Sequence, residues 1–356
     1  MNLHPDSRVC YRASVAGDRV VRHTGPPTPP TVYLLAPNTA TSEGDVVVTV
    51  PGDLNTSDDR ELIDGSGANS VEDQRIDPAD AFSALGDPLR IDILQELSAH
   101  HRTTGESDIG FADLRRRVGV RDSGRFRYHL NELRGHFVKK TDDGYQLTHA
   151  GIQVVAAIIA GTYTETVSMG PNELDSQCPF CGQAAIATYE DGVCFVTCDD
   201  DHTLFQWSVP PNASADATLP EVVDLAQMLA FQAIEQTLVG VCPQCYDTIE
   251  TTVTADEGSR PIFRAVCDTC GAQVVGPVAF CLLVDPDVAA FCREHGLTVR
   301  DDHVWEFPFV AEDAGFTLID EDPVRIECSI SLDSETFGVI VDDRGHVESI
   351  HPPDTK

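Results

Sequence analysis

Hydrophobic positions between residues 76 and 165 recur with a helical period. Asp77 and Asp87 each stand directly before a proline, which is typical of an N-cap followed by proline at the first helical position. We therefore predict helices over 78–85 and 88–98. The second helix places its apolar side chains on one face, namely Leu89, Ile93, Leu94 and Leu97.

Three further helices and a hairpin follow in the same region. The periodicity predicts helices over 111–118, 123–134 and 149–164. Ahead of the last helix, segments 137–140 and 145–147 flank Thr141-Asp142-Asp143-Gly144, whose Asp-Gly pair is a hairpin signal. Helices followed by a hairpin in this order predict a winged helix-turn-helix domain over 76–165.

Beyond Gln177 the pattern changes to short strands and paired cysteines, interrupted by a helix over 220–238. After Cys281 a helix is predicted over 286–295, with Gly296 as its C-cap. Strands are predicted near 304–310, 324–332 and 337–341.

The fold class is therefore multidomain α+β, with an N-terminal winged helix-turn-helix, two zinc-ribbon-like β modules and a small C-terminal α+β part. Residues 1–75 hold Pro-rich and Ser/Asp/Gly-rich stretches that make a poor core. We interpret them as a disordered tail or as an extension ahead of a true start such as Val71. The remaining boundaries are 174–212 for the first ribbon, 219–239 for a connecting helix, 240–280 for the second ribbon and 281–350 for the C-terminal part.

The chain is strongly acidic, with 58 Asp and Glu against 24 Lys and Arg and a formal net charge of -34. Its basic residues are nearly all Arg and Asp outnumbers Glu by about two to one, a bias that resembles proteins of extreme halophiles. An acidic surface ordinarily repels nucleic acid. Residues 101–140 depart from this, with ten Arg or Lys against five Asp or Glu.

No apolar run approaches the ~18 residues that a membrane helix needs. The N-terminus lacks the continuous apolar core of a secretory signal. We therefore expect a cytoplasmic protein with no membrane partner. In that compartment thiols stay reduced, so the 12 cysteines point to metal binding more than to disulfides.

The predicted helix over 123–134 has two distinct faces. Phe126, Leu130 and Leu133 share the core face, and Tyr128 points nearly opposite. Arg, Asn and Tyr on an outer face suit guanine edges, adenine edges and phosphates of DNA. The candidate DNA contacts on this helix are Ser123, Gly124, Arg125, Arg127, Tyr128 and Asn131.

The neighbouring elements add further cations. In winged helix-turn-helix domains the helix before the reader crosses the phosphates, and the hairpin, here 138–147, acts as the wing. Gly124 could also let a phosphate approach the backbone near the helix N-terminus. The alternative is that these cations only pair with neighbouring acids. The added candidates are Arg115, Arg116, Arg117, Lys139 and Lys140.

The segment Ala84-Leu85-Gly86-Asp87-Pro88-Leu89-Arg90-Ile91-Asp92-Ile93-Leu94 resembles the opening signature of ArsR-type winged-helix transcriptional regulators. The resemblance extends to about residue 165, and the layout resembles haloarchaeal regulators with a Cys-rich C-terminal region. It implies a homodimer formed by helices 78–98 and 149–164. The family's metal sensors carry a Cys pair before the reader helix. Phe111–Arg115 has none, so arsenic or cadmium sensing there is not supported.

The last helix of this domain is apolar around most of its circumference, as expected for a helix buried on two sides. The alternative is a helix buried within its own domain. Its apolar residues are Ile152, Val154, Val155, Ile158 and Ile159.

Two sets of cysteines have the spacing of zinc ligands. Cys242-Pro243-Gln244-Cys245 is followed after 21 residues by Cys267-Asp268-Thr269-Cys270. Two such turns can bring their thiolates to a tetrahedron. The other set needs His202, or else Cys194, as its fourth ligand and could instead be degenerate. Its three cysteines are Cys178, Cys181 and Cys198.

Four protein ligands leave no open position for a substrate, so we predict structural Zn2+, which can contribute roughly 10 to 16 kcal/mol to the folding of a small module. The alternative is that these cysteine sets sense a metal ion or a redox change. Core packing is expected for the unpaired Cys10, Cys281, Cys292 and Cys328.

No phosphate loop, GxSxG elbow, HExxH motif or glycine fingerprint occurs in the sequence, so we predict neither an enzyme nor an identifiable small-molecule effector. The leading hypothesis is a dimeric transcriptional regulator that reads double-stranded DNA with helix 123–134 and contacts its backbone with wing 138–147. The competing hypothesis is a protein-interaction module in which the winged helix and the zinc ribbons dock a partner, without direct DNA reading. RNA binding through the ribbons is disfavoured because Cys178–Cys270 is strongly acidic.

Overall fold

The computed structural model describes residues 31–33, 76–255, 260–311 and 315–351. It is mixed α+β with several antiparallel sheets. The described residues form two compact units. The N-terminal unit holds 76–230 and 300–307, and the C-terminal unit holds 31–33, 231–299 and 308–351. Most of the segment 1–75, interpreted above as a tail or an extension, lies outside the described residues, as does Cys10.

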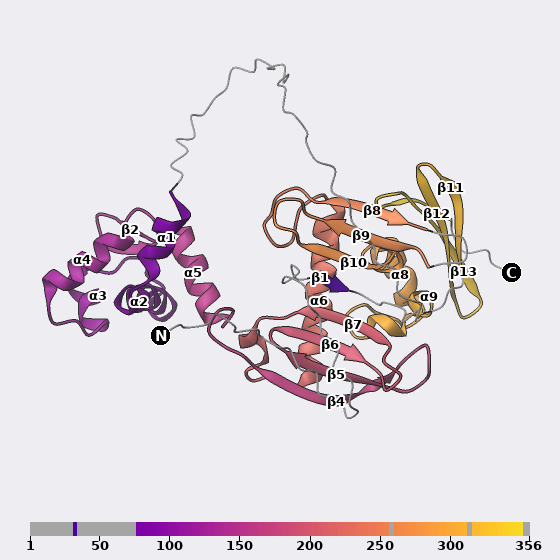
Figure 1. Cartoon of the computed structure of the whole chain (residues 1–356), viewed down its shortest axis with the longest axis horizontal. Coiled ribbons are helices and arrows are strands. Elements are labelled where there is room, and N and C mark those ends of the chain that lie inside the picture. Colours follow the sequence, from indigo (N-terminus) through magenta and orange to yellow (C-terminus); the bar gives the residue numbers. More distant parts are fainter. Residues whose placement is uncertain (1–30, 34–75, 256–259, 312–314, 352–356) are drawn as a thin grey trace, which may run out of the picture. The chain divides into compact units, whose positions relative to one another are not determined.

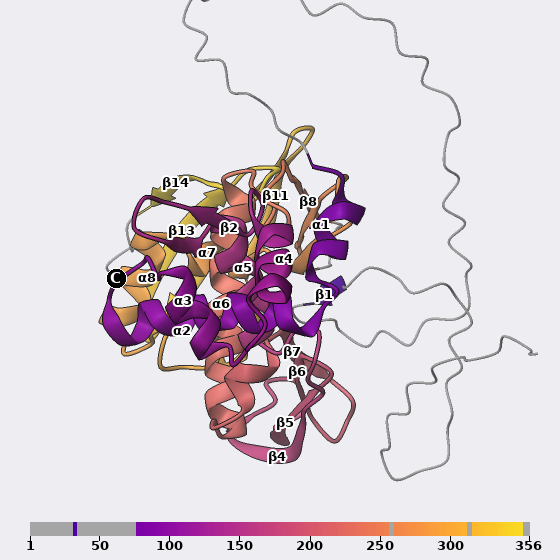
Figure 2. The same ribbon diagram turned by 90° about the vertical axis from the view of Figure 1, so that its left-hand side faces the viewer.

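The N-terminal unit begins with five helices and a hairpin, residues 78–159, which we call the helical region (Figure 1, Figure 2). The hairpin strands β2 and β3 pair antiparallel. The elements are α1 Pro78–Leu85, α2 Pro88–Thr104, α3 Phe111–Arg117, α4 Ser123–Leu133, β2 Val138–Lys140, β3 Tyr145–Leu147 and α5 His149–Ile159.

Side-chain caps explain where these helices begin. The predicted starts of α1 and α2 are confirmed, because Asp77 and Asp87 accept the backbone N–H groups of Ala79 and Leu89. The predicted ends are less accurate. α2 outlasts 88–98 and stops at Gly105, which has a φ of 75°. α5 is shorter than 149–164.

One apolar core holds the helical region together. The prediction that Phe126, Leu130 and Leu133 form the core face of α4 is confirmed, since each is at most 1% exposed. The opposite face of α4 therefore points away from the core. The main partners in this core are Ile93, Leu94 and Leu97 of α2, Leu114 of α3 and Val138 of β2.

The rest of the N-terminal unit is an antiparallel sheet of order β4-β5-β6-β7 and the first part of a long helix. Their bounds are β4 Ser168–Gln177, β5 Ala184–Glu190, β6 Val193–Thr197, β7 Thr203–Ser208, η1 Pro211–Ser214 and α6 Leu219–Leu238. Segment 300–307 joins this unit through Trp305, whose Nε1 donates to Ser176 Oγ at 2.8 Å.

The C-terminal unit holds two four-stranded sheets and three short helices. In the first sheet, β1 Thr31–Tyr33 runs parallel to β10 Gln273–Pro277, followed by β9 Ile262–Val266 and β8 Glu250–Thr254, both antiparallel. The second, fully antiparallel, has the order β11 Phe316–Glu321, β12 Val324–Leu332, β13 Glu335–Val341 and β14 Val347–His351. The helices are α7 Ala279–Leu283, α8 Pro286–Glu294 and α9 Pro308–Ala311.

The predicted strand near 304–310 is wrong. This stretch forms η2 Val304–Glu306 and the start of α9. A short apolar run is compatible with a buried helix as well as with a strand, and Pro308 stands at the first helical position. The strands predicted near 324–332 and 337–341 are confirmed as β12 and most of β13. Core packing is confirmed for the buried Cys281, Cys292 and Cys328.

Candidate metal centres and candidate nucleic-acid interface

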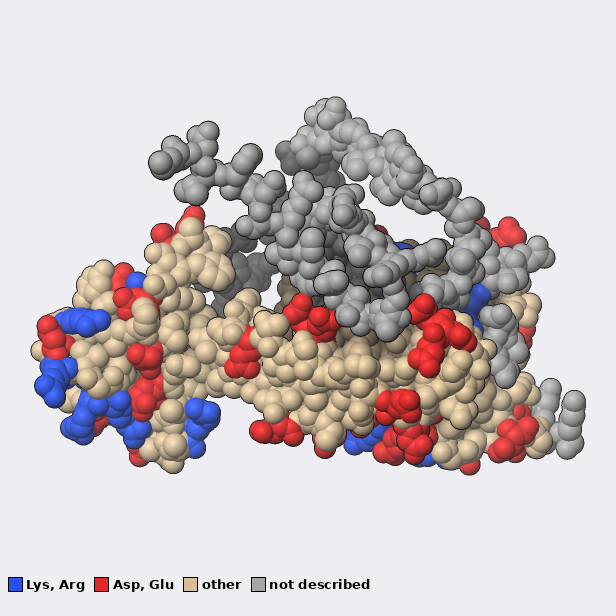
Figure 3. All heavy atoms as spheres, turned by 60° about the horizontal axis from the view of Figure 1, so that its bottom comes forward, with Lys and Arg blue, Asp and Glu red and all other residues tan. Residues whose placement is uncertain are grey.

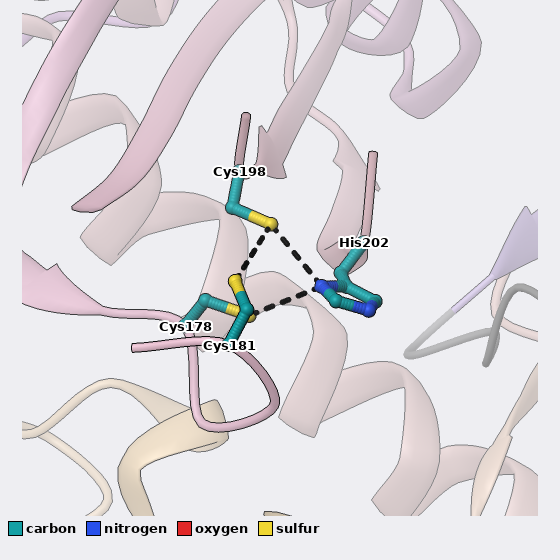
Figure 4. A group of neighbouring side chains, drawn as sticks. All are labelled: Cys178, Cys181, Cys198 and His202. Atoms are coloured by element: carbon teal, nitrogen blue, oxygen red, sulfur yellow. Dashed lines mark hydrogen bonds between the residues drawn. The ribbon is translucent and has the colours of Figure 1, made fainter. Parts of the chain in front are cut away.

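Each set of paired cysteines converges in space. The ligand atoms within each set all lie within 4.8 Å of one another, so both sets could hold a metal ion. Figure 4 shows how the side chains of the first set point toward one another. Cluster 1 consists of Cys178, Cys181, Cys198 and His202, and cluster 2 of Cys242, Cys245, Cys267 and Cys270.

The separations between ligand atoms fit a tetrahedral metal site. In cluster 2 both pairs of Sγ atoms that face each other across the two turns are 3.6 Å apart. In cluster 1 the Sγ atoms of Cys181 and Cys198 are also 3.6 Å apart. Metal–sulfur bonds of about 2.3 Å at tetrahedral angles place sulfurs about 3.8 Å apart. The thiols therefore already lie at the spacing that a zinc-sized ion requires.

His202, and not Cys194, completes cluster 1. His202 Nδ1 lies 3.5 Å from the Sγ of Cys178 and 3.3 Å from that of Cys198. Cys194 is fully buried in β6 outside the cluster. Burial raises the pKa of the Cys194 thiol to about 12, as expected for a thiol in the core. The geometry therefore favours His202 over Cys194 as the fourth member of cluster 1.

Three of the four ligand-bearing turns share one backbone geometry. In each, the first Cys N–H donates to the carbonyl five residues later, and the residue four positions later donates back to the Cys carbonyl. That last residue is left-handed, with φ of 73° at Gly182, 74° at Gly271 and 63° at Tyr246. Glycine adopts this conformation without strain, whereas tyrosine does not. These turns begin at Cys178, Cys242 and Cys267.

The fourth turn, Cys198–His202, is tighter. Cys198 N–H donates to the His202 carbonyl at 3.2 Å, and Asp201 N–H donates to the Cys198 carbonyl at 3.0 Å. Asp201, with a φ of 60°, takes the left-handed position. The CxxxH spacing thus closes a turn that presents both ligand atoms to one side (Figure 4).

The thiols of cluster 2 ionise unequally. Burial opposes ionisation of Cys242, but hydrogen bonds from the backbone N–H groups of Cys245 and Gln244 and from neighbouring thiols lower its pKa to about 7. The Asp247 N–H favours the Cys245 thiolate, yet hydrogen bonds with the three other thiols, together with burial, raise its pKa to about 12. A cation at the centre of cluster 2 would offset the repulsion between thiolates, which otherwise keeps the remaining thiols protonated.

The cationic candidates gather on the helical region. Figure 3 shows Lys and Arg side chains, with acids among them, over the helical region at the left of the view. Of the 11 candidate DNA contacts, all but the half-buried Arg115 are exposed. Tyr128, on the outer face of α4, is 59% exposed. The two faces expected for this helix are therefore both present.

Some of these arginines already have partners. Arg116 pairs with Asp113 at 2.8 Å and Arg117 with Glu96 at 2.9 Å. Arg115 Nη1 donates at 2.6 Å to a backbone carbonyl in the α3–α4 turn. Exposed ion pairs contribute only about 0–1 kcal/mol, so Arg116 and Arg117 could exchange these partners for phosphates.

The cap of α4 changes the expectation for Gly124. The Asp122 carboxylate accepts the N–H groups of Gly124 at 2.7 Å and Arg125 at 3.1 Å. These hydrogen bonds lower the pKa of Asp122. The Gly124 amide that was expected to face a phosphate is therefore already satisfied. Arg127 lies with its guanidinium 5.3 Å from the centre of the Phe111 ring, a cation–π contact that orients it.

The hairpin presents its cations on a strand and its acids at the tip. Lys139 and Lys140 are exposed on β2, whereas Asp142 and Asp143 are exposed in the turn. Thr141, the first residue of the hairpin turn, contacts Asp108, which the sequence pattern did not single out because it lies in a polar loop between α2 and α3.

Two family models match this chain, both described as domains of unknown function. One (DUF7347) matches residues 78–158, and the other (DUF7351) matches residues 175–347. The first spans α1 to nearly the end of α5, and the second includes both clusters. No curated protein and no solved structure matches the chain. Among the described residues, no helix has both the length and the apolar character required to span a membrane.

Proposed function

We propose that this chain is a sequence-specific DNA-binding transcriptional regulator of the ArsR type. Its helical region is a winged helix-turn-helix in which α4 enters the major groove and β2–β3 is the wing. The role is non-catalytic. Neither family match names an activity, so the proposal depends on the chemistry of α4 and its neighbours.

The observation that carries the proposal is the division of α4 into two faces. Its inner face is buried in the core, while Arg125, Tyr128 and Asn131 are exposed on the other side. Arginine can bond guanine bidentately, asparagine can bond adenine, and tyrosine can reach phosphate. Because α4 is held by its core and capped by Asp122, these groups are presented by a rigid element.

The homodimer that the ArsR resemblance implies is part of the proposal. Phe82 on α1 is 75% exposed, and Ile152 and Ile159 on α5 are 52% and 44% exposed. Only Gly151 and Val155 of α5 are buried. The described part of the chain thus leaves α5 incompletely covered, which favours a second copy over burial within one domain.

We further propose that both clusters bind structural Zn2+. Cysteine and histidine ligands at tetrahedral spacing are the usual donor set for zinc, and each cluster supplies four of them. Bound zinc would cross-link the turns that close the β4–β7 and β8–β10 sheets. The role as scaffold follows from the full ligand set, which leaves no position for a substrate.

Chromatin immunoprecipitation of the tagged full chain in its host tests the proposal. The informative variant is Arg125→Ala combined with Tyr128→Ala. Arg344→Ala, an exposed arginine in the turn between β13 and β14, is the charge-matched control for the first substitution. Discrete peaks that are lost in the double variant and kept in the control are expected.

Absence of peaks for the wild-type chain at normal abundance and folding would contradict DNA reading. It would favour the protein-interaction alternative, in which the winged helix and the zinc ribbons dock a different protein.

A further inference from the structure

The hairpin of the helical region is tied to the loop between α2 and α3 by one carboxylate. Asp108 Oδ1 accepts the hydroxyl of Thr141 at 2.5 Å and the side-chain amide of Gln146 at 3.3 Å. Thr141 begins the hairpin turn and Gln146 lies in β3. Asp108 therefore holds both sides of the hairpin.

The backbone next to Asp108 makes a second connection. Ile109 N–H donates to the Tyr145 carbonyl at 3.1 Å, and Tyr145 N–H donates back at 3.0 Å. Gly144 lies so close that a Cβ there would collide with the Ile109 carbonyl. Ile109 thus pairs with Tyr145 of β3 as a third strand of one residue, and these two hydrogen bonds fix its register.

These contacts act on the strand that carries the cations. In the β2–β3 ladder, Lys139 lies opposite Gln146 and Lys140 lies opposite Tyr145. Gln146, which Asp108 holds, and Tyr145, which Ile109 holds, are therefore the direct cross-strand neighbours of the two lysines. Two-stranded hairpins are only marginally stable alone, so an external anchor decides how well such a strand is ordered.

We propose that Asp108 is a positioning residue that orders the hairpin so that Lys139 and Lys140 meet the DNA backbone. This inference rests on the proposed DNA-binding function. It assigns to Asp108 no contact with DNA. The carboxylate acts through Thr141 and Gln146, and a charged acceptor makes these hydrogen bonds stronger than a neutral one would.

A double-mutant cycle on the full chain separates positioning from general damage. Affinity is measured for a DNA duplex enriched in the immunoprecipitation and for a random-sequence duplex of the same length. Asp108→Ala should weaken binding several-fold, but no more than Lys139→Ala/Lys140→Ala does, because Asp108 acts only through the two lysines. In a Lys139→Ala/Lys140→Ala background, Asp108→Ala should cause no further loss.

Two variants control for the fold. Asp108→Asn keeps an oxygen acceptor for Thr141 and should retain most of the affinity. Thr141→Val removes the hydroxyl from the other side and should reproduce the loss even if Asp108→Ala fails to fold. Hydrogen exchange of the β2 and β3 amides should be faster in Asp108→Ala and in Thr141→Val than in wild type.

The outcomes are distinct. Equal losses with and without the lysines, or no loss in either background, overturn the positioning role while leaving DNA binding intact. If the wild-type chain binds neither duplex, the proposed function fails, and the role of Asp108 fails with it.

Discussion

Tyr246 stands at a backbone position that two otherwise identical turns give to glycine. Its φ of 63° is left-handed, and its side chain is 76% exposed, so few contacts offset the strain. We expect Tyr246→Gly to stabilise the metal-loaded chain by about 0.5–1 kcal/mol, after allowing for the greater entropy of glycine in the unfolded chain. Thermal unfolding measures this.

Gly182 provides the matched control. It has a φ of 73° with no atom within 4 Å of an added Cβ, so Gly182→Ala tests the conformation without a clash. This substitution should destabilise the chain by about 1 kcal/mol. A destabilising Tyr246→Gly would show that the exposed ring makes a contact that outweighs its backbone strain.

The choice of the fourth ligand in cluster 1 gives a prediction in metal content. If both clusters bind zinc as proposed, His202→Ala should lower the zinc content from two ions per chain to one, because the ring whose Nδ1 lies 3.3 Å from Cys198 Sγ is lost. Cys194→Ala should leave two, because Cys194 lies outside the cluster. Elemental analysis of purified protein distinguishes them. A drop in Cys194→Ala with His202→Ala unchanged would reverse the assignment.

At the residue scale, spacing in the sequence identified the ligands but not the turns that hold them. Pairs of Cys two residues apart have few ways to bring their thiols together, so the cluster 2 ligands could be predicted from spacing alone. The choice between His202 and Cys194 depended on the register of β6 and β7. The strain at Tyr246 depended on a backbone angle. Neither is encoded in spacing.

At the scale of elements, the β2–β3 hairpin, which is the proposed wing, carries opposing charges. Asp142 and Asp143 form its exposed tip, next to a strand that carries Lys139 and Lys140. If the tip approaches phosphates, its carboxylates weaken binding. Asp142→Asn with Asp143→Asn should therefore raise affinity for duplex DNA several-fold at low salt. Titration against a labelled duplex measures this.

The acids Asp342 and Asp343, in the turn between β13 and β14, provide a comparison outside the wing. Neutralising the exposed Asp343 to Asn changes the net charge without changing the wing, so its effect reports non-specific repulsion alone. If the wing substitutions and Asp343→Asn raise DNA affinity equally per charge removed, the wing tip lies away from DNA.

Element starts were easier to predict than element ends. Asp77 and Asp87 are both N-caps, and capping chemistry is local, so the starts of α1 and α2 could be predicted from sequence. The end of α2 could not, because the helix runs on to Gly105 through Thr103 and Thr104, two residues of low helix propensity. The failed strand near 304–310 has a tertiary cause, since Trp305 is buried against residues far away in sequence.

At the scale of the whole molecule, the proposed homodimer depends on apolar side chains that one chain leaves exposed. Ile152→Glu should convert the dimer to a monomer, because a charge at the interface would be buried without a partner. Ile319→Glu, at a similarly exposed isoleucine of β11, should leave the dimer intact. Light scattering on size-exclusion chromatography gives the mass. A dimer that survives Ile152→Glu would place the interface elsewhere.

The net charge of -34 and the bias toward Arg and Asp resemble those of halophilic proteins, so binding of DNA in molar salt is the relevant case if the host is a halophile. In molar salt the Debye length falls to about 3 Å, and the gain from counterion release largely disappears. Contacts to base edges depend much less on salt than contacts to phosphates. The contributions of Arg125 on α4 and Lys140 on β2 to DNA affinity should therefore depend differently on salt concentration.

We expect Arg125→Ala to weaken binding to the enriched duplex by about tenfold or more at both 0.1 M and 2 M KCl, as for loss of a base contact worth about 1–3 kcal/mol. Lys140→Ala should weaken it at 0.1 M and have little effect at 2 M. The affinity ratio of each variant to wild type, measured at both salt concentrations, gives the result. Equal salt dependence of the two ratios would contradict this division, since it would mean that Arg125 also contacts phosphate and that α4 does not read base edges through it.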